Sequence, residues 1–131
     1  MEKKRLFLLS AFAMLFTLTV NAQVPGIKFE RDVYDFDLIR EEDGVVTTVF
    51  EFINDGNAPL IINSVVASCG CTAVDWTREP VPVAGKGFIK VSYNPKGRPG
   101  SFSKSVTVRS NASEEPVVLR IKGKVVFREK D

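Results

Sequence analysis

Cys69 and Cys71 are the only cysteines in this 131-residue chain, and a single glycine separates them. In an extended chain the side chains at i and i+2 point to the same side, so both thiols are expected to face one way. Three states are open to such a pair: a disulfide, a dithiolate that binds a soft metal such as Cu(I), or two small thiols buried as apolar groups. Cys69 and Cys71 are therefore candidates for a disulfide or thiol site, with Ser68, Gly70 and Thr72 as supporting residues.

A disulfide between residues so close in sequence would stabilise the fold little. The chain-entropy relation gives roughly 1.6 kcal/mol for a loop of about three residues, against about 3 kcal/mol for fifteen. Closing the bridge draws the Cα atoms together from their extended spacing, which favours a reducible bond. We therefore expect such a bridge to serve local shape or redox chemistry. Gly70 is expected to permit the tight turn because it has no Cβ.

The chain contains no histidine, which removes the commonest general base and the commonest metal ligand. Ser-His-Asp hydrolases, Cys-His proteases and His-ligated zinc sites are thereby excluded. Both methionines lie before residue 15, so a Cu(I) site at Cys69 and Cys71 would have only thiolate ligands once residues 1–22 are removed. We predict that the protein is not an enzyme and needs no cofactor.

Residues 1–22 have the features of a cleavable secretory signal peptide. Three basic residues at positions 3–5 precede an apolar run over 6–20, and small side chains before Gln23 offer a cleavage site. The apolar run is shorter than the roughly 20 residues that a spanning helix needs. No later segment is apolar enough to span a membrane, so none is expected after cleavage. The protein is thus predicted to be exported, either to the periplasm or out of the cell.

The signal peptide changes the charge balance of the chain. The whole sequence has 18 Lys and Arg against 16 Asp and Glu. Residues 1–22 hold three of the basic and one of the acidic residues, so residues 23–131 carry fifteen of each and no net charge. Nucleic-acid binders usually carry a basic stripe, so no nucleic-acid partner is expected.

After residue 22, apolar and polar residues alternate with a period of two, which is typical of half-buried strands. Polar, glycine and proline residues divide this pattern into about seven strand regions and no helix. The expected regions are 27–39 with a bend near Arg31 and Asp32, 45–53, 60–67, a short run ending at Trp76, 88–93, 102–109 and 117–127. This spacing predicts an all-β, immunoglobulin-like antiparallel β-sandwich over residues 23–131.

The alternation also predicts which side chains face the core. A lone tryptophan in a sandwich usually packs in the core, so Trp76 is expected there rather than on a ligand surface. Residues 54–57, Asn-Asp-Gly-Asn, are the strongest turn signal, because these residue types tolerate positive φ. Arg120, Lys122 and Lys124 are expected to line a solvated face or to protect a sheet edge. The expected core residues are Val46, Phe50, Phe52, Ile89, Val91, Tyr93, Phe102, Val106, Val108, Leu119, Ile121 and Val125.

Several motifs extend along the chain in a recognisable order. A Phe-x-Phe-x-Asn-x-Gly strand and turn occupies residues 50–56, and the Ser-Cys-Gly-Cys-Thr element occupies residues 68–72. Further matching stretches are residues 34–36, 58–62, 97–102, 106–111 and 119–125. Taken together, these motifs resemble domain of unknown function family 1573, a bacterial family. Asp37 departs from the glycine usual in that family, and Ala84 departs from a proline common there before Gly85.

The resemblance implies an immunoglobulin-like sandwich exported by a Gram-negative bacterium. It implies no established activity and supplies no catalytic residues. Together with the neutral surface, it predicts an exported non-catalytic module that contacts another envelope protein or has a structural role in the envelope. The alternative is a thiol redox or Cu(I)-binding module that uses Cys69 and Cys71.

Overall fold

The structure is a computed structural model that describes residues 21–127 of the chain. The predicted signal peptide therefore lies almost entirely outside the described residues. Between residues 21 and 127, no helix is long and apolar enough to cross a membrane.

The described residues form eight strands and one short 3₁₀ turn. The predicted strand regions are confirmed with two differences: the first is divided into two strands at its expected bend, and the last begins at Ser113 instead of residue 117. The elements are β1 (Lys28–Phe29), β2 (Val33–Arg40), η1 (Glu41–Asp43), β3 (Val46–Ile53), β4 (Ile62–Ala67), β5 (Thr72–Trp76), β6 (Lys86–Tyr93), β7 (Gly100–Ser110) and β8 (Ser113–Val126).

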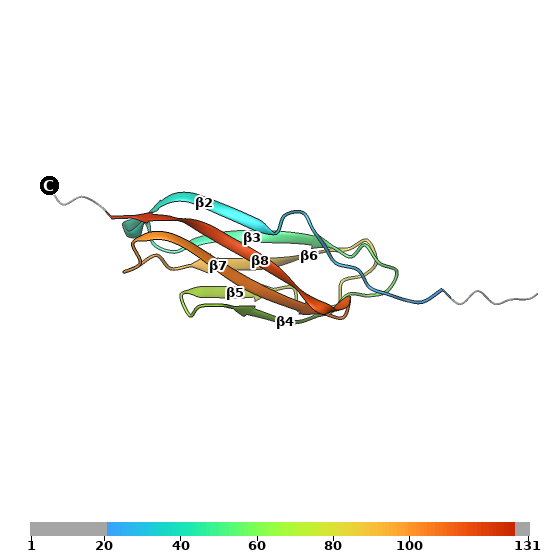
Figure 1. The fold of residues 1–131 in the computed structure, drawn as a ribbon. Helices are drawn as coiled ribbons and strands as arrows, with labels where there is room; N and C mark the ends of the chain where they lie inside the picture. The colour runs from blue at the N-terminus through green and yellow to red at the C-terminus, as the bar shows by residue number, and fades with distance from the viewer. Residues whose placement is uncertain (1–20, 128–131) are drawn as a thin grey trace, which may run out of the picture.

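The strands make two four-stranded sheets that pack as a sandwich (Figure 1). One sheet has the order β1-β3-β6-β5 and the other has the order β2-β8-β7-β4. The predicted all-β sandwich is confirmed, but one pair departs from the antiparallel expectation, because β2 runs parallel to β8. The chain leaves the first sheet after Phe29 and enters the second at Val33. Beside this crossing, the amide of Arg120 donates to the Asp32 carbonyl at 2.8 Å. A period-two pattern cannot reveal such a change of sheet.

The two sheets meet in the predicted core. Tyr93 of one sheet and Phe102 of the other stack face to face, with ring centroids 4.0 Å apart and planes 13° apart. Val46 is only partly buried, and the other eleven predicted core residues are buried. Burial is complete for Phe50, Ile89, Val91, Val106, Leu119 and Ile121.

The turn at residues 54–57 is built around a buried asparagine. Asn54 is 1% exposed, and its amide nitrogen donates to the carbonyls of Ala58 at 2.7 Å and Val81 at 3.0 Å. Its side-chain oxygen accepts the amides of Gly26 at 3.1 Å and Gly56 at 3.0 Å. Four hydrogen bonds from one side chain thus connect three separate segments of the chain.

Positive φ is not the reason for this turn, so the sequence-based explanation was wrong. None of residues 54–57 has positive φ. A Cβ on Gly56 would meet the backbone of Val24, Pro25 and Gly26 at less than contact distance. Glycine is therefore required by close packing of two backbone segments, not by conformational freedom.

Among the described residues, two non-glycine residues have positive φ, Asp37 at 59° and Ala84 at 63°. Both are the positions that depart from the family pattern. A glycine at 37 would adopt this conformation without steric cost. A proline at 84 could not adopt it, because its ring holds φ near −65°.

Candidate functional site: the disulfide turn and the uncharged edge

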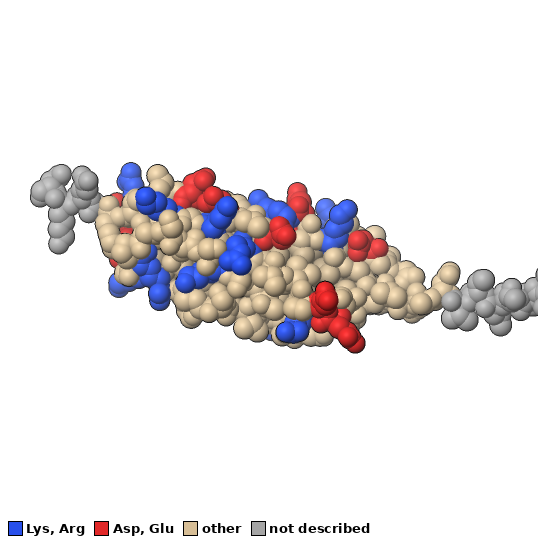
Figure 2. All heavy atoms as spheres, in the orientation of Figure 1, with Lys and Arg blue, Asp and Glu red and all other residues tan. Residues whose placement is uncertain are grey.

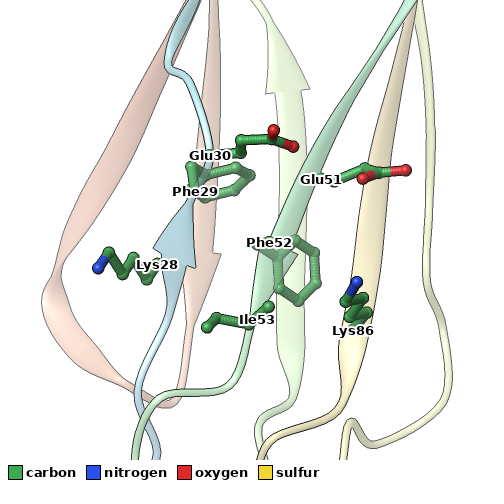
Figure 3. A pocket seen from close by; sticks show the side chains of 7 residues that line it. All are labelled: Lys28, Phe29, Glu30, Glu51, Phe52, Ile53 and Lys86. Carbon is green, nitrogen blue, oxygen red and sulfur yellow. The ribbon is translucent and has the colours of Figure 1, made fainter.

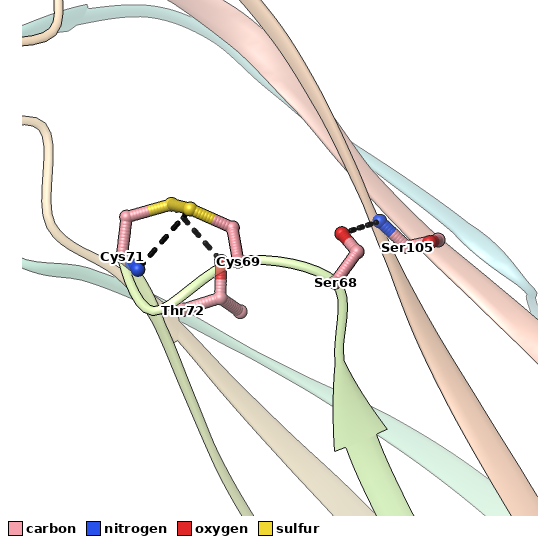
Figure 4. The surroundings of a disulfide bond; sticks show 5 residues. All are labelled: Ser68, Cys69, Cys71, Thr72 and Ser105. Atoms are coloured by element: carbon pink, nitrogen blue, oxygen red, sulfur yellow. Dashed lines mark hydrogen bonds between the residues drawn. A yellow bond between two sulfur atoms is a disulfide. The ribbon is translucent and has the colours of Figure 1, made fainter.

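Cys69 and Cys71 form a disulfide in the turn that carries the chain from β4 to β5 (Figure 4). Their Cα atoms are 5.2 Å apart. Since β4 and β5 are outermost strands of opposite sheets, the disulfide lies where the chain crosses the sandwich. The five residues of the motif are thus brought together in one turn.

Backbone hydrogen bonds hold the turn independently of the disulfide. The Thr72 amide donates to the Cys69 carbonyl at 3.1 Å, and the Asn94 amide donates to the Cys71 carbonyl at 3.0 Å. Ser68 extends the pairing of β4 with β7, because its amide donates to the Ser105 carbonyl at 2.9 Å and its hydroxyl accepts the Ser105 amide at 3.2 Å (Figure 4). Ser68 and Thr72 therefore anchor the two ends of the turn.

The two sulfur atoms have different surroundings. Cys69 is half-buried and Gly70 is exposed, whereas Cys71 is 7% exposed. The backbone amide of Cys71 donates to the Cys69 Sγ at 3.2 Å. The Thr72 Oγ1 lies 3.8 Å from the Cys71 Sγ. A disulfide sulfur carries no hydrogen, so the Thr72 hydroxyl is the donor in this contact.

Gly70 does not have the role expected from the sequence. A Cβ built on it meets nothing within 4 Å outside its chain neighbours, and its φ is not positive. The tight turn therefore does not depend on a missing Cβ. An Ala at this position is sterically accommodated.

The disulfide is expected to contribute little to stability. We predict that replacing both cysteines with Ala lowers the free energy of unfolding by about 1 to 2 kcal/mol, since the closed loop is very short and the turn keeps its backbone bonds. Urea unfolding of the wild-type and double-variant proteins measures this difference, with Gly70→Ala as a nearly neutral control. A loss well above about 3 kcal/mol would show instead that the bridge is a principal staple of the fold.

The disulfide turn lies within an unusually uncharged part of the chain. No Asp, Glu, Lys or Arg occurs from Gly56 to Val74, although these residues make up 26% of the sequence. We call β4, the disulfide turn and the first three residues of β5, Thr72 to Val74, the uncharged edge. In Figure 2 most charged side chains lie along the upper part of the molecule, while the lower margin carries a basic group near β4 and acidic groups beyond it. Sequence reasoning missed this feature, although a scan for charge gaps would have found it.

One side of β4 has unpaired backbone groups. The Ser68 amide bonds to the Ser105 carbonyl of β7, and bonded and non-bonded pairs alternate along an antiparallel ladder. The backbone amides and carbonyls of the even-numbered β4 residues therefore point toward β7. The backbone groups of Val65 and Ala67 consequently point away from β7. Within the described residues, β4 has no ladder partner on that side. The outward side chain of Val66 is 59% exposed.

The outer side of β5 is better blocked. The Thr72 amide is used within the turn, and the amide of Trp76 is accepted by the Asp75 carboxylate at 2.9 Å. Trp76 packs against the core while half-buried, and the Arg78 guanidinium carbon lies 3.4 Å from its ring centroid. Arg78 also lies 3.8 Å from the Asp75 carboxylate. The predicted core packing of Trp76 is thus partial, and Arg78 covers part of the remaining ring surface.

A pocket of about 320 Å³ lies over β1, β3 and the start of β6 (Figure 3). Lys28, Ile53 and Lys86 share one row of the sheet. Figure 3 shows the carboxylate of Glu51 pointing away from Glu30, so these groups do not converge as a general acid and base would. This pocket offers mixed charge around apolar surface, and its lining residues are Lys28, Phe29, Glu30, Glu51, Phe52, Ile53 and Lys86.

The basic row on β8 is a solvated face. Arg120, Lys122 and Lys124 are exposed, and Arg120 donates to the Ser103 hydroxyl at 2.9 Å. Because β8 is paired on both sides, with β2 and with β7, these residues do not protect a sheet edge. The first of the two expected roles is therefore the one the structure supports.

One titratable group beside the turn has a shifted pKa. Burial raises the pKa of Tyr93, which pairs with Thr72 across β5 and β6, while the nearby Arg98 charge acts in the opposite direction. The Tyr93 phenol therefore remains a neutral hydroxyl near pH 7. Among the described residues, no three His, Cys, Asp or Glu side chains are grouped as metal ligands would be.

The two packed sheets and the disulfide turn at one edge define a β-sandwich module. The chain belongs to the DUF1573 family, proteins of unknown function, whose family model matches residues 27–125. The resemblance noted from the motifs is thereby confirmed. No curated protein matches the chain in sequence.

Solved structures share the fold at low sequence identity. A protein of unknown function from Porphyromonas gingivalis W83 is 14% identical to this chain, with a TM-score of 0.68. The match covers 84% of this chain and 51% of that protein. The secreted serine protease VesC from Vibrio cholerae is also 14% identical, with a TM-score of 0.57, and the match covers 82% of this chain and 24% of the protease. A family 123 glycoside hydrolase from Clostridium perfringens is 7% identical, with a TM-score of 0.57, and the match covers 82% of this chain and 28% of the hydrolase. The chain thus spans about half of the first protein and about a quarter of the other two.

Proposed function

We propose that the protein is an exported, non-catalytic β-sandwich module that binds another envelope protein by adding an extended segment of that protein to β4. The observation that carries this proposal is the unpaired, uncharged outer side of β4. Export to the periplasm or beyond the cell is part of the proposal, and it rests on the signal-peptide features of residues 1–22. The Gram-negative origin in the proposal rests on the family resemblance.

An exposed strand edge favours another polypeptide as its ligand. The amides and carbonyls of Val65 and Ala67 repeat at strand spacing, and an extended backbone can satisfy them together. Proteins usually block such edges with charged side chains, proline or a bulge. At the opposite edge of the same sheet, β2 has a register shift between Asp35 and Leu38, with acidic side chains. β4 has a register shift near Ile62 but no charge.

The side chains beside this edge indicate the composition of the partner. Val66, Thr107 and Val118 form one row across β4, β7 and β8, and the two valines are 59% and 48% exposed. A bound segment would therefore place apolar side chains on this face at alternate positions, because strand side chains alternate. An uncharged segment fits best beside Val66 and Val118, because charge placed against these apolar side chains would lose hydration. The nearest charge on β7 is the exposed Arg109, which pairs with Ser64.

Peptide selection tests the proposal. We expect peptides selected from a displayed random library on the wild-type protein to be uncharged and apolar at alternate positions. Binding should weaken about tenfold or more in Val66→Lys, because a charge is introduced beside the bound strand. Val33→Lys is a matched control, because Val33 is 43% exposed on the opposite edge strand of the same sheet.

Amide hydrogen exchange locates the bound segment. A selected peptide should slow exchange at Val65 and Ala67, whose amides face away from β7. Equal binding to Val66→Lys and the wild type, or unchanged exchange at both amides, would rule out strand addition at β4.

A second function, thiol exchange, is supported by a separate observation. The disulfide lies at the surface, and its two cysteines differ in exposure. Cu(I) binding would require the reduced dithiol, and it remains a prediction based on the two cysteines alone.

A further inference from the structure

We infer that the Cys69–Cys71 disulfide exchanges with an external thiol, with Cys69 as the sulfur that is attacked and Cys71 as the sulfur that leaves. The inference deepens the thiol alternative and does not depend on partner binding at β4. It is carried by the different exposure of the two cysteines and by the different hydrogen bonds to their sulfur atoms.

Access decides which sulfur an incoming thiolate reaches. Cys71 is 7% exposed and directly precedes β5, whose first residue, Thr72, is equally buried. Cys69 is half-buried and lies beside the exposed Gly70, where a Cβ added to the glycine would have no other part of the described chain within 4 Å. The more exposed Cys69 is therefore the more open of the two cysteines to an incoming thiolate.

Hydrogen bonds give each sulfur a suitable role. When Cys71 leaves as a thiolate, the Thr72 hydroxyl, now 3.8 Å from its Sγ, is placed to donate to the new negative charge. In the fully reduced state, the Cys71 amide can donate to a Cys69 thiolate, since it already lies 3.2 Å from that Sγ (Figure 4). A hydrogen bond to the charged form lowers a thiol pKa. Because both sulfurs have a donor, the greater exposure of Cys69 makes it the expected nucleophile and Cys71 the resolving cysteine.

The exchange balances without a cofactor. A thiolate R–S⁻ attacks the Cys69 Sγ, the Cys69–Cys71 bond breaks, and its electron pair leaves on Cys71, which takes a proton from water. The product is a mixed disulfide between Cys69 and the external thiol. A second external thiolate then releases an R–S–S–R disulfide and the reduced Cys69. In the reverse direction the Cys69 and Cys71 dithiol reduces an external disulfide.

The turn is built to survive this cycle. Both of its ends are held by backbone bonds that do not involve sulfur, from Thr72 to Cys69 and from Asn94 to Cys71. Ser68 remains bonded to Ser105 at the start of the turn. Reduction should therefore leave both thiols near their present positions, ready to reform the bridge.

Two single-cysteine variants test the assigned roles. Cys71→Ala leaves only Cys69, and Cys69→Ala leaves only Cys71. We expect the folded Cys71→Ala protein to react with Ellman's reagent at pH 7 about tenfold faster or more than Cys69→Ala. After both proteins are unfolded in urea the two rates should become equal, which shows that the difference comes from the fold. Equal rates in the folded state, or a faster Cys71, would overturn the assignment.

The wild-type protein tests whether exchange occurs at all. It is incubated with reduced glutathione or with an uncharged peptide that carries one cysteine, quenched with acid, and mapped by mass spectrometry. We expect the mixed disulfide on Cys69 while amide exchange of the core stays native. A faster reaction with the peptide would identify protein thiols as the substrate, and a faster reaction with glutathione would identify small thiols. If neither thiol reacts until the protein unfolds in urea, the disulfide is structural and the inference fails.

Discussion

Replacing Asn54 with Ala is expected to destabilise the protein by about 3 to 5 kcal/mol, because four hydrogen bonds, two of them buried and two partly buried, are lost at once. The Asn54 side chain donates to Ala58 and Val81 and accepts from Gly26 and Gly56. With Ala in its place, the Ala58 carbonyl loses its Asn54 donor, whereas the Val81 carbonyl keeps the Leu60 amide at 2.9 Å. Burying an unpaired polar group costs more than the bond itself contributes. The free energy of unfolding from urea titration measures the loss.

Asn57 provides the matched control in the same turn. Its side chain also bonds to the segment before β1, accepting the Val24 amide at 2.7 Å, but it is exposed. Asn57→Ala should therefore cost no more than about 1 kcal/mol, since water replaces the lost partner. Similar losses for Asn54→Ala and Asn57→Ala would show that Asn54 does not join the segments as its hydrogen bonds indicate.

The sequence pattern predicted the strands well because burial of alternate side chains leaves a direct record in residue type. Leu119 and Ile121 are fully buried, and Arg120 between them is exposed, as the alternation required. The pattern could not show which strands pair. The change of sheet between Phe29 and Val33, and the parallel pairing of β2 with β8, depend on contacts between residues far apart in the chain.

The candidate site was predicted in its composition but not in its geometry. The spacing of Cys69 and Cys71 indicated a possible bridge, which the structure contains. The role assigned to Gly70 was wrong, because its missing Cβ is not sterically required. No role was predicted for the Ser68 hydroxyl, which bonds to a distant strand. The unequal burial of the two cysteines depends on how the sheets close around the turn, and local sequence does not encode that directly.

Ala84 tests how far the family pattern can be applied to this chain. The Gly85 amide donates to the Pro82 carbonyl at 2.8 Å, and Ala84 between them has φ of 63° while Val83 does not have positive φ. These are the features of a type II turn, which favours glycine at its third position. The Ala84 amide also donates to the Asn54 carbonyl at 2.9 Å. The turn is therefore fixed both by its own geometry and by the buried asparagine.

Opposite effects are expected for two substitutions at this position. Ala84→Gly should raise the free energy of unfolding by about 0.5 to 1 kcal/mol, because glycine adopts positive φ without a Cβ clash. Ala84→Pro should lower it by about 3 kcal/mol or more, since proline cannot reach this φ and removes the amide that bonds to Asn54.

Val83→Pro is the control that separates turn geometry from a general intolerance of proline. The second position of a type II turn has φ near −60°, which proline favours, so this variant should change stability by less than about 1 kcal/mol. Thermal and urea unfolding of the three variants compare them with the wild type. If Ala84→Pro were as stable as Val83→Pro, the turn would adopt a different conformation from the one described, and the proline common at this position in the family would be compatible with this chain as well.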